Sequence, residues 1–342
     1  MKRSRGKVHP RPAERALPIP LGTKVRERFK IIDVIGRGGM STVYRAIDLV
    51  RVRARAVDTD VALKVIDVDE GYRQDAIALL HREGRRLLEL QHPNIVRVYD
   101  SDEDGSLHFL VMELLHGKTL ARALAEREGQ PLDPAVALRI IAGVGAGLSA
   151  AHAAGMIHGD IKPGNIFITR DGGVKLIDFG TAQATARRDQ PLDDDDTSLY
   201  IDRLRAVTPA YASLEMLGGD TPDARDDVFS FAVIAYLILA GSHPFEGKTA
   251  AQAWQEGMAP PRPPALSAPR WVVLREALTL ARAERTAHVA AFARRLRAPG
   301  LQDYWRAWLR RPPKAPANPP PPDTMPEAPS ETATEPPPRE TS

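Results

Sequence analysis

Cysteine is absent from the 342 residues of this sequence. Disulfides, thiolate metal sites and thiol nucleophiles are therefore excluded, and the composition suits a reducing compartment. The N-terminus lacks the apolar segment of a signal peptide, so we expect a cytoplasmic protein. The longest apolar run, residues 228–241, contains Ser230 and is shorter than the roughly 20 residues that span a membrane, which predicts a buried helix and no membrane span.

A large excess of charge is also absent. The chain has 47 Lys and Arg against 44 Asp and Glu, a formal net charge of +3, so no extended nucleic-acid surface is expected. With 43% hydrophobic residues it can bury the core of one large or two medium globular units. The composition therefore predicts a globular protein without a nucleic-acid partner.

Apolar patterning is weakest at the two ends, where proline interrupts the chain. Residues 1–27 are also basic, which predicts a flexible N-terminal arm. Residues 299–342 combine proline with acidic, serine and threonine residues, a composition that favours a disordered tail. We interpret this tail as an inert extension, with docking of protein partners on PxxP-type segments as the alternative. The folded part is then residues 28–298.

Short, β-branched runs dominate the first part of the folded region. They predict strands at 29–36, 41–48, 61–67, 95–100 and 107–114. Between the third and fourth of these, apolar residues recur at helical spacing and predict an amphipathic helix over 73–90.

After Gly117 the pattern is helical. It includes a long helix that Asp133 caps, with Pro134 at its first position. The sequence thus predicts an α+β fold with two lobes, a small β-rich lobe at 28–115 and a larger α-helical lobe at 116–298.

Three glycines, Gly36, Gly38 and Gly39, lie in the turn between two predicted strands. A dinucleotide-binding motif would instead join a strand to a helix. Glycines in such a turn let backbone N–H groups approach a polyphosphate closely. Glycine-rich hairpins are common, so this feature alone carries little weight.

Lys64 lies in the apolar strand VALKV, and Glu83 interrupts the apolar face of the following helix. A buried lysine is rare unless it is paired. We therefore predict that Lys64 points inward and pairs with Glu83.

The strongest local signal is HGDIKPGN at 158–165, followed by LIDFG at 176–180. These segments place Asp160, Lys162, Asn165 and Asp178 on two neighbouring loops, separated by the predicted hairpin IFITRDGGVKLI. Carboxylate and amide oxygens are ligands that suit Mg²⁺ together with phosphate. The pattern indicates a metal and phosphate site.

Together these motifs resemble the catalytic domain of the protein kinase family, in its bacterial Ser/Thr form (Hanks-type). The resemblance covers residues 28 to about 297, in order, and implies a bilobal protein-kinase-like fold. The segments that carry it are GRGGMSTVYRA, VALKV, HREGRRL, HGDIKPGN, DFG, TPAYASLE, DDVFSFAV and RAERTAHVAAF.

By this resemblance Lys64 holds the α- and β-phosphates of ATP, and Glu83 holds Lys64. Asp178 and Asn165 bind Mg²⁺, with Mn²⁺ as an alternative metal. Asp160 orients the substrate hydroxyl and accepts its proton, and Lys162 neutralises charge on the transferred group. The resemblance also assigns to the nucleotide site Ile35, Gly36, Gly38, Gly39, Val43, Ala62, Met112, Glu113 and Leu115.

The same resemblance implies structural roles. Asp227 bonds to backbone amides of the catalytic loop, and Glu215 pairs with Arg285. A packed column joining the lobes is formed by Leu87, Val98, His158 and Phe179.

The sequence departs from the family pattern at Gly159, where an arginine is usual. That arginine normally receives a phosphate from the activation segment, so phosphorylation at Thr197, Ser198 or Thr208 is not expected to control activity. Leu214 replaces a usual proline. The segment 49–59 is longer than expected, and no function is assigned to it.

We therefore expect a Mg·ATP-dependent protein Ser/Thr kinase of bacterial signalling, which also phosphorylates itself. Lys162 favours Ser/Thr over Tyr specificity by the same resemblance. The alternatives are a pseudokinase that acts as a scaffold, supported only by Gly159, and a phosphotransferase for small molecules. The sequence names neither the protein substrate nor the oligomeric state.

Overall fold

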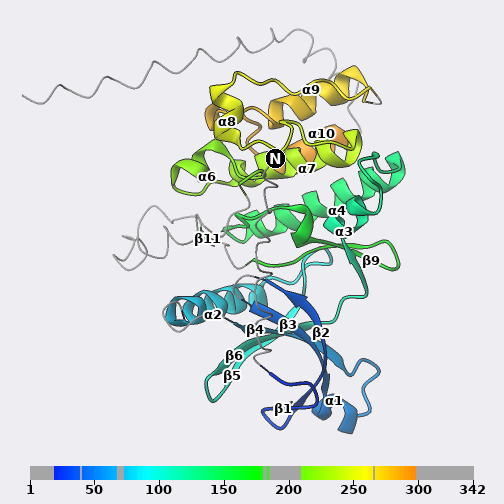
Figure 1. Cartoon of the computed structure of the whole chain (residues 1–342), viewed down its shortest axis with the longest axis vertical. Helices are drawn as coiled ribbons and strands as arrows, with labels where there is room; N and C mark the ends of the chain where they lie inside the picture. Colours follow the sequence, from blue (N-terminus) through cyan, green and yellow to red (C-terminus); the bar gives the residue numbers. More distant parts are fainter. Residues whose placement is uncertain are drawn as a thin grey trace, which may run out of the picture.

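The computed structural model describes residues 19–38, 41–67, 73–179, 183–184, 209–264 and 266–297. These residues form two lobes stacked along the long axis of the molecule (Figure 1). The N-lobe, blue to cyan, is a curved sheet with one long helix, and the C-lobe, green to orange, is mainly helical. The predicted α+β fold with a small β-rich lobe and a larger α-helical lobe is confirmed.

The N-lobe sheet is antiparallel, with strand order β1-β2-β3-β4-β6-β5. Consecutive strands are neighbours except around β4, which pairs with β6. The strands are β1 (Lys24–Val25), β2 (Phe29–Arg37), β3 (Ser41–Asp48), β4 (Asp60–Ile66), β5 (Val98–Asp104) and β6 (Leu107–Glu113). A short helix, α1 (Leu49–Arg53), joins β3 to β4.

Alternation along the strands gives the sheet two buried faces. One face carries a core that includes Phe29, Tyr44 and Phe109. The other face packs on α2 (Arg73–Glu89), which contacts β4, β5 and β6. Because Leu63 and Val65 belong to the first core, Lys64 between them points to the α2 side.

The expectation that the whole segment 1–27 is a flexible arm needs correction for residues 19–27. Ile19 and Val25 are buried in the N-lobe core, and β1 pairs with β2. The Ile19 amide donates to the Tyr44 hydroxyl at 3.1 Å. Isolated apolar residues among basic ones are enough to attach residues 19–27 to the N-lobe, because each packs into a sheet formed by later residues. Residues 1–18 lie outside the described part of the chain, as does the predicted tail 299–342.

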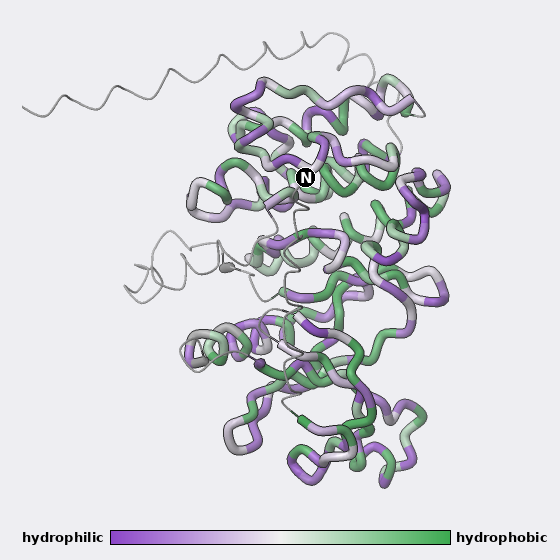
Figure 2. The backbone as a smooth tube through the Cα atoms, in the orientation of Figure 1, coloured by the Kyte–Doolittle hydropathy of each residue, from purple (hydrophilic) through white to green (hydrophobic). Residues whose placement is uncertain are grey.

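The C-lobe is built around two long helices. The helices of this lobe are α3 (Leu120–Ala125), α4 (Pro134–Ala153), α6 (Leu214–Gly218), α7 (Ala224–Ala240), α8 (Ala250–Gln255), α9 (Ala268–Ala277) and α10 (Val289–Arg297). Most of α7 is buried on all sides, which confirms the buried helix expected in this region. Figure 2 shows apolar residues concentrated in the strands around the N-lobe core and in the inner helices of the C-lobe.

Within the described residues, α4 is the one helix long and apolar enough to cross a membrane by length and composition. Half of that stretch is buried inside the protein, where α4 packs against α7, α10 and β10 (Val174–Leu176). Asp133 caps α4 with Pro134 in its first turn, as predicted. The helix is thus part of the C-lobe core.

Small sheets line the junction of the lobes. One has the order β10-β9-β7, with β9 (Ile166–Thr169) and β7 (Gly117–Thr119), and the other pairs β8 (Met156–Ile157) with β11 (Gln183–Ala184). The predicted hairpin IFITRDGGVKLI is therefore the β9–β10 hairpin. It fixes the spacing between the loops on either side of it, which carry Asp160 and Asp178.

Candidate active site

Pairing between the strands places the residues assigned to the nucleotide site in the N-lobe opposite or next to one another. Gly36 faces Val43, and Val43 faces Lys64, across β2, β3 and β4. One row along, Ala62 faces Met112 across β4 and β6. Residues opposite one another, or two apart on a strand, share a face. Val43, Ala62, Lys64 and Met112 therefore lie on the face of the sheet opposite the N-lobe core.

Around Gly36 and Gly38 the described residues leave room for a Cβ atom. A Cβ at Gly36 would come no closer than 3.8 Å to Val43, and one at Gly38 no closer than 3.5 Å to the Ser41 carbonyl oxygen. Both are ordinary contact distances, so packing against the described residues does not require glycine at these positions. Ile35 beside them is 48% exposed. This space agrees with the predicted close approach of a ligand to the glycine turn. Gly39 lies outside the described residues.

Lys64 is held between carboxylates from both lobes. Its Nζ donates to Glu83 Oε2 at 2.7 Å and to Asp178 Oδ1 at 2.9 Å. Burial lowers the pKa of Lys64, but Asp178 and Glu83 outweigh this, and the net pKa is raised. Attraction to the Lys64 ammonium lowers the pKa of Asp178 to about 2. The predicted Lys64–Glu83 pair is confirmed, and it extends to Asp178 as a charged triad.

The loop before β9 gathers three more candidates. Lys162 Nζ donates to Asp160 Oδ2 at 2.6 Å, and Asn165 Nδ2 donates to the same oxygen at 3.0 Å. Asn165 Nδ2 also donates to the Asp160 backbone carbonyl at 2.8 Å. Burial raises the pKa of Asp160, and Lys162 opposes this rise. The arrangement fixes the Asp160 carboxylate and turns the amide nitrogen of Asn165 toward it.

Asp227 in α7 holds the backbone of this loop from below. Its two carboxylate oxygens accept from the amides of His158 and Gly159, each at 2.9 Å. This confirms the predicted role of Asp227. The sequence did not indicate that His152 Nε2 also contacts Asp227 Oδ2, at 2.7 Å. Only its place in the last turn of α4, shortly before the loop, could have suggested that contact.

The column predicted to join the lobes is buried throughout. The rings of His158 and Phe179 lie 4.4 Å apart between centroids. Leu87 and Val98 are buried in the same core as Phe179. Between Phe179 and the end of the hairpin, Asp178 has a φ of 65°, which a non-glycine residue rarely adopts. Packing of the flanking residues therefore holds the Asp178 backbone in a strained conformation that directs its side chain toward Lys64.

Buried ion pairs support the lobe behind the site. Arg285 Nη2 donates to Glu215 Oε2 at 3.0 Å, with the Arg285 side chain fully buried, which confirms the predicted pair. A second pair was not predicted: Arg282 Nη2 donates to Asp226 Oδ2 at 2.9 Å. Both arginines lie in or next to the 3₁₀ turn η3 (Arg282–Glu284).

The segment that joins the lobes begins at the end of β6. Met112 and Leu115 are half-buried there. The Glu113 amide donates to the Arg97 carbonyl at 2.9 Å, so a backbone contact from Glu113 to a ligand would use its carbonyl oxygen. Lys175 Nζ donates to Glu113 Oε1 at 2.6 Å and ties this segment to the C-lobe.

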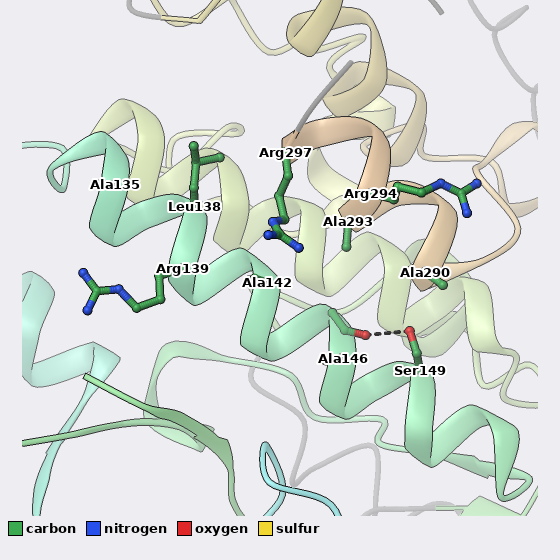
Figure 3. A pocket seen from close by; sticks show the side chains of 11 residues that line it. Ala135, Leu138, Arg139, Ala142, Ala146, Ser149, Ala290, Ala293, Arg294 and Arg297 are labelled. Atoms are coloured by element: carbon green, nitrogen blue, oxygen red, sulfur yellow. Dashed lines mark hydrogen bonds between the residues drawn. The ribbon is translucent and has the colours of Figure 1, made fainter. Parts of the chain in front are cut away.

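A surface cavity elsewhere has none of this chemistry. It lies between α4 and α10 and is lined by five alanines, by Leu138, Gly145 and Ser149, and by Arg139, Arg294 and Arg297 (Figure 3). None of the described residues that line it has a carboxylate, amide or imidazole side chain. The charged groups between the lobes are therefore the candidate active site.

The side-chain oxygens of Asn165 and Asp178 are the potential metal ligands of the site. Because the Asn165 amide nitrogen bonds to Asp160, its oxygen Oδ1 is directed away as an acceptor. The low pKa of Asp178 keeps its carboxylate charged at neutral pH. An amide oxygen and a charged carboxylate fit a hard divalent cation.

A model of the protein kinase domain matches residues 29–288. The serine/threonine-protein kinase PknL of Mycobacterium bovis is 38% identical over 223 residues, which are 65% of this chain and 52% of that protein. PknB of Mycolicibacterium smegmatis is 37% identical over 245 residues, which are 70% of this chain and 36% of that protein. The chain thus spans about half the length of these relatives, or less.

Solved structures show the same fold. The crystal structure of the Mycobacterium tuberculosis PknI kinase domain matches with a TM-score of 0.59 and 23% identity, covering 82% of this chain and 100% of that one. At this identity the likeness concerns the fold.

Proposed function

The chain belongs to the protein kinase family, in its serine/threonine form, and from this premise we propose that it is catalytically active. It would transfer the γ-phosphoryl group of ATP to Ser and Thr hydroxyls of proteins, including its own. The observation that carries the proposal is the triad of Lys64, Glu83 and Asp178, which joins the two lobes beside the bonded cluster around Asp160.

Each group has a defined part in the transfer. Lys64 and the backbone of the glycine turn bind phosphate oxygens. Asp160 accepts the proton of the attacking hydroxyl, whose oxygen forms a bond to the γ-phosphorus while the bond to the β-phosphate oxygen breaks and ADP leaves. Lys162, 2.6 Å from Asp160, offsets negative charge on the phosphoryl group. Positioning contributes most, because the transition state is largely dissociative.

We further propose Mg²⁺ as the metal, with Mn²⁺ as a substitute. Asp178 and Asn165 would hold it through carboxylate and amide oxygens. When bound, the ion neutralises charge on the phosphates. Mg²⁺ fits better than Zn²⁺ because both of these ligands are oxygens and neither is sulfur or imidazole.

A pseudokinase is the weaker alternative. It requires the loss of at least one group needed for transfer, and Lys64, Asp160, Asn165 and Asp178 are all present and placed together. Gly159 does not touch the reacting atoms in the assigned roles. The family match and the named relatives also disfavour a phosphotransferase for small molecules.

A phosphorylation assay with γ-labelled ATP, Mg²⁺ and a generic basic protein tests the proposal. Asp160→Asn and Lys64→Met should each abolish labelling, because one removes the proton acceptor and the other the phosphate contact. Lys248→Met is the control, because Lys248 forms an exposed ion pair with Glu256 in the C-lobe. This variant should keep full activity. Labelling by Asp160→Asn equal to that of the parent would contradict the proposal.

We also propose that the protein acts in the cytoplasm and takes part in bacterial signalling. The absence of cysteine suits a reducing compartment, and the relatives named above are bacterial. Protein substrates follow from the family. For the proline-rich tail, residues 299–342, an inert extension remains our interpretation, with docking of protein partners as the alternative.

A further inference from the structure

Three potential metal ligands meet on the N-lobe surface, away from the proposed active site. His81 comes from α2, whereas Glu103 and His108 are directly paired across β5 and β6. We call these residues the outer histidine cluster. Their ligand atoms all lie within 4.8 Å of one another.

Two of the three distances inside the cluster are close to those between ligands of a tetrahedral ion, and the third is at most 4.8 Å. His81 Nε2 lies 3.1 Å from His108 Nδ1, and His108 Nδ1 lies 3.5 Å from Glu103 Oε2. Ligand atoms at about 2.0–2.1 Å from a tetrahedral Zn²⁺ are separated from one another by roughly 3.3–3.5 Å. Small side-chain movements would therefore be enough to admit an ion.

A neighbouring group orients the first ligand. His81 Nδ1 lies 2.9 Å from the Ser101 hydroxyl, on the strand that carries Glu103. Ligating histidines commonly bond through the other ring nitrogen in this way, which directs the ligating nitrogen and fixes its tautomer. In the tautomer that carries its proton on Nδ1, His81 donates to Ser101, and the lone pair of Nε2 then faces His108.

Exposure gives the ion a path and a fourth ligand. The Glu103 side chain is 64% exposed, whereas that of His108 is only 17% exposed. One negative carboxylate and two imidazoles in a half-open setting resemble open zinc sites, in which solvent completes the coordination. Mg²⁺ is disfavoured because it prefers oxygen ligands.

We propose that His81, Glu103 and His108 form a binding site for a divalent transition-metal ion of the Zn²⁺ type, separate from the proposed Mg²⁺ site. The ion would take the place of the hydrogen bond between the two imidazoles. It would join α2 directly to the β5–β6 hairpin.

The position of the site suggests a regulatory effect, which rests on the proposed function. His81 precedes Glu83, the partner of Lys64, by two residues on α2. An ion that fixes His81 to the hairpin restrains α2 where Glu83 reaches Lys64. Binding of the ion itself does not depend on kinase activity, so the two statements can fail separately.

The binding test uses the full chain, freed of metal, without nucleotide. Zn²⁺ is titrated against a chromophoric chelator, and Co²⁺ is added in a parallel experiment to read the visible absorption of a tetrahedral site. We expect His108→Gln and Glu103→Gln each to weaken Zn²⁺ binding at least about tenfold, because loss of outer-shell partners alone has an effect of about 10–100-fold. His288→Gln, an exposed histidine in the C-lobe, should bind like the parent.

Equal Zn²⁺ affinity in the parent and His108→Gln would overturn the proposal, as would an absence of Zn²⁺ binding by the parent. Circular dichroism and thermal unfolding without metal check that the variants fold. Hydrogen exchange of α2 gives the second readout: Zn²⁺ should slow it in the parent and not in His108→Gln. If Zn²⁺ binds the parent but leaves the hydrogen exchange of α2 unchanged, the proposed restraint of α2 is refuted and the metal site is not.

Discussion

Gly159 directly precedes Asp160, and its backbone matters as much as its missing side chain. Its φ of 74° lies in the left-handed region, which glycine adopts at little conformational cost. In this conformation its amide donates to Asp227. Glycine thus suits the path of the loop, while position 159 itself offers no guanidinium to bind a phosphate.

One prediction at this scale concerns the activation segment. The double variant Thr197→Ala, Ser198→Ala should keep kinase activity within severalfold of the parent, because a phosphate added there would find no arginine at position 159. Thr197, Ser198 and Thr208 lie outside the described residues, so the argument comes from Gly159. Initial rates with a basic protein substrate measure the effect. A loss of a hundredfold or more would show that phosphorylation controls the site by another route.

Single residues differ in how far their partners could be predicted. Lys64 and Glu83 each interrupt an apolar pattern, which is a local signal for a buried pair. The contacts from His152 to Asp227 and within the outer histidine cluster have no such signal. Histidine is common at half-buried positions of every kind, and its partner depends on how distant segments pack.

At the scale of elements, α2 is held close to the sheet by a glycine. A Cβ at Gly84 would lie 2.6 Å from Leu110 Cδ2 and 3.0 Å from Ser101 Cβ, both on the hairpin strands β5 and β6. Glycine therefore lets α2 approach the sheet closely enough for Glu83 to reach Lys64. The sequence predicted the helix but not the reason for this glycine.

Gly84→Ala should therefore destabilise the protein, although alanine usually favours a helix by about 1 kcal/mol over glycine. Overpacking of a tight contact typically costs about 1–3 kcal/mol, and we expect a net loss at the lower end of that range. Urea unfolding measures it. Gly218→Ala in α6 is the control, since nothing lies within 4 Å of its added Cβ, and it should not lose stability. A stability gain in Gly84→Ala would contradict the close packing of α2.

The pair of Glu215 and Arg285 joins α6 to the chain after η3. The Arg285 side chain is fully buried and that of Glu215 is 13% exposed. Arg285→Met should lower the free energy of unfolding by about 3–5 kcal/mol, because it leaves the largely buried Glu215 carboxylate without its charged partner. Arg295→Met, which removes a more exposed pair with Glu276, should cost about 1 kcal/mol or less. Equal losses in the two variants would rule out a special role for the buried pair.

The arginine-rich segment 49–59 received no function from the sequence, and the structure gives it a structural role. Asp48 caps α1 and also binds Arg28, with Oδ2 2.8 Å from Nη2. The Arg51 guanidinium lies 4.3 Å from the centre of the Tyr99 ring. The segment thus packs against the outer end of the N-lobe sheet.

For the whole molecule, the ion pair of Lys64 and Asp178 predicts a dependence of stability on pH. The pKa of Asp178 is lowered from 3.8 to about 2, so its contribution is present above pH 3.8 and is lost as pH falls through about 2. The pKa of Lys64 is raised, so its contribution is present below 10.5 and is lost at higher pH.

Unfolding free energies of the parent and Asp178→Asn should therefore converge as pH falls from 4 to 2. Urea unfolding at several pH values measures this, without nucleotide or metal. Other carboxylates with lowered pKa, such as Asp227, act equally in both proteins and cancel in the comparison. Parallel curves over this range would contradict the inter-lobe ion pair.

The sequence by itself determined the two-lobed α+β fold, the family, and the order of the motifs around Lys64, Asp160 and Asp178. It could do so because periodicity and motif spacing are properties of residues near one another in the chain. Only the tertiary structure decided that residues 19–27 belong to the N-lobe, that Lys64 also binds Asp178, and that His81 meets the β5–β6 hairpin. These contacts depend on the packing of distant segments, since residues 64 and 178 are 114 positions apart and no local pattern records such a distance.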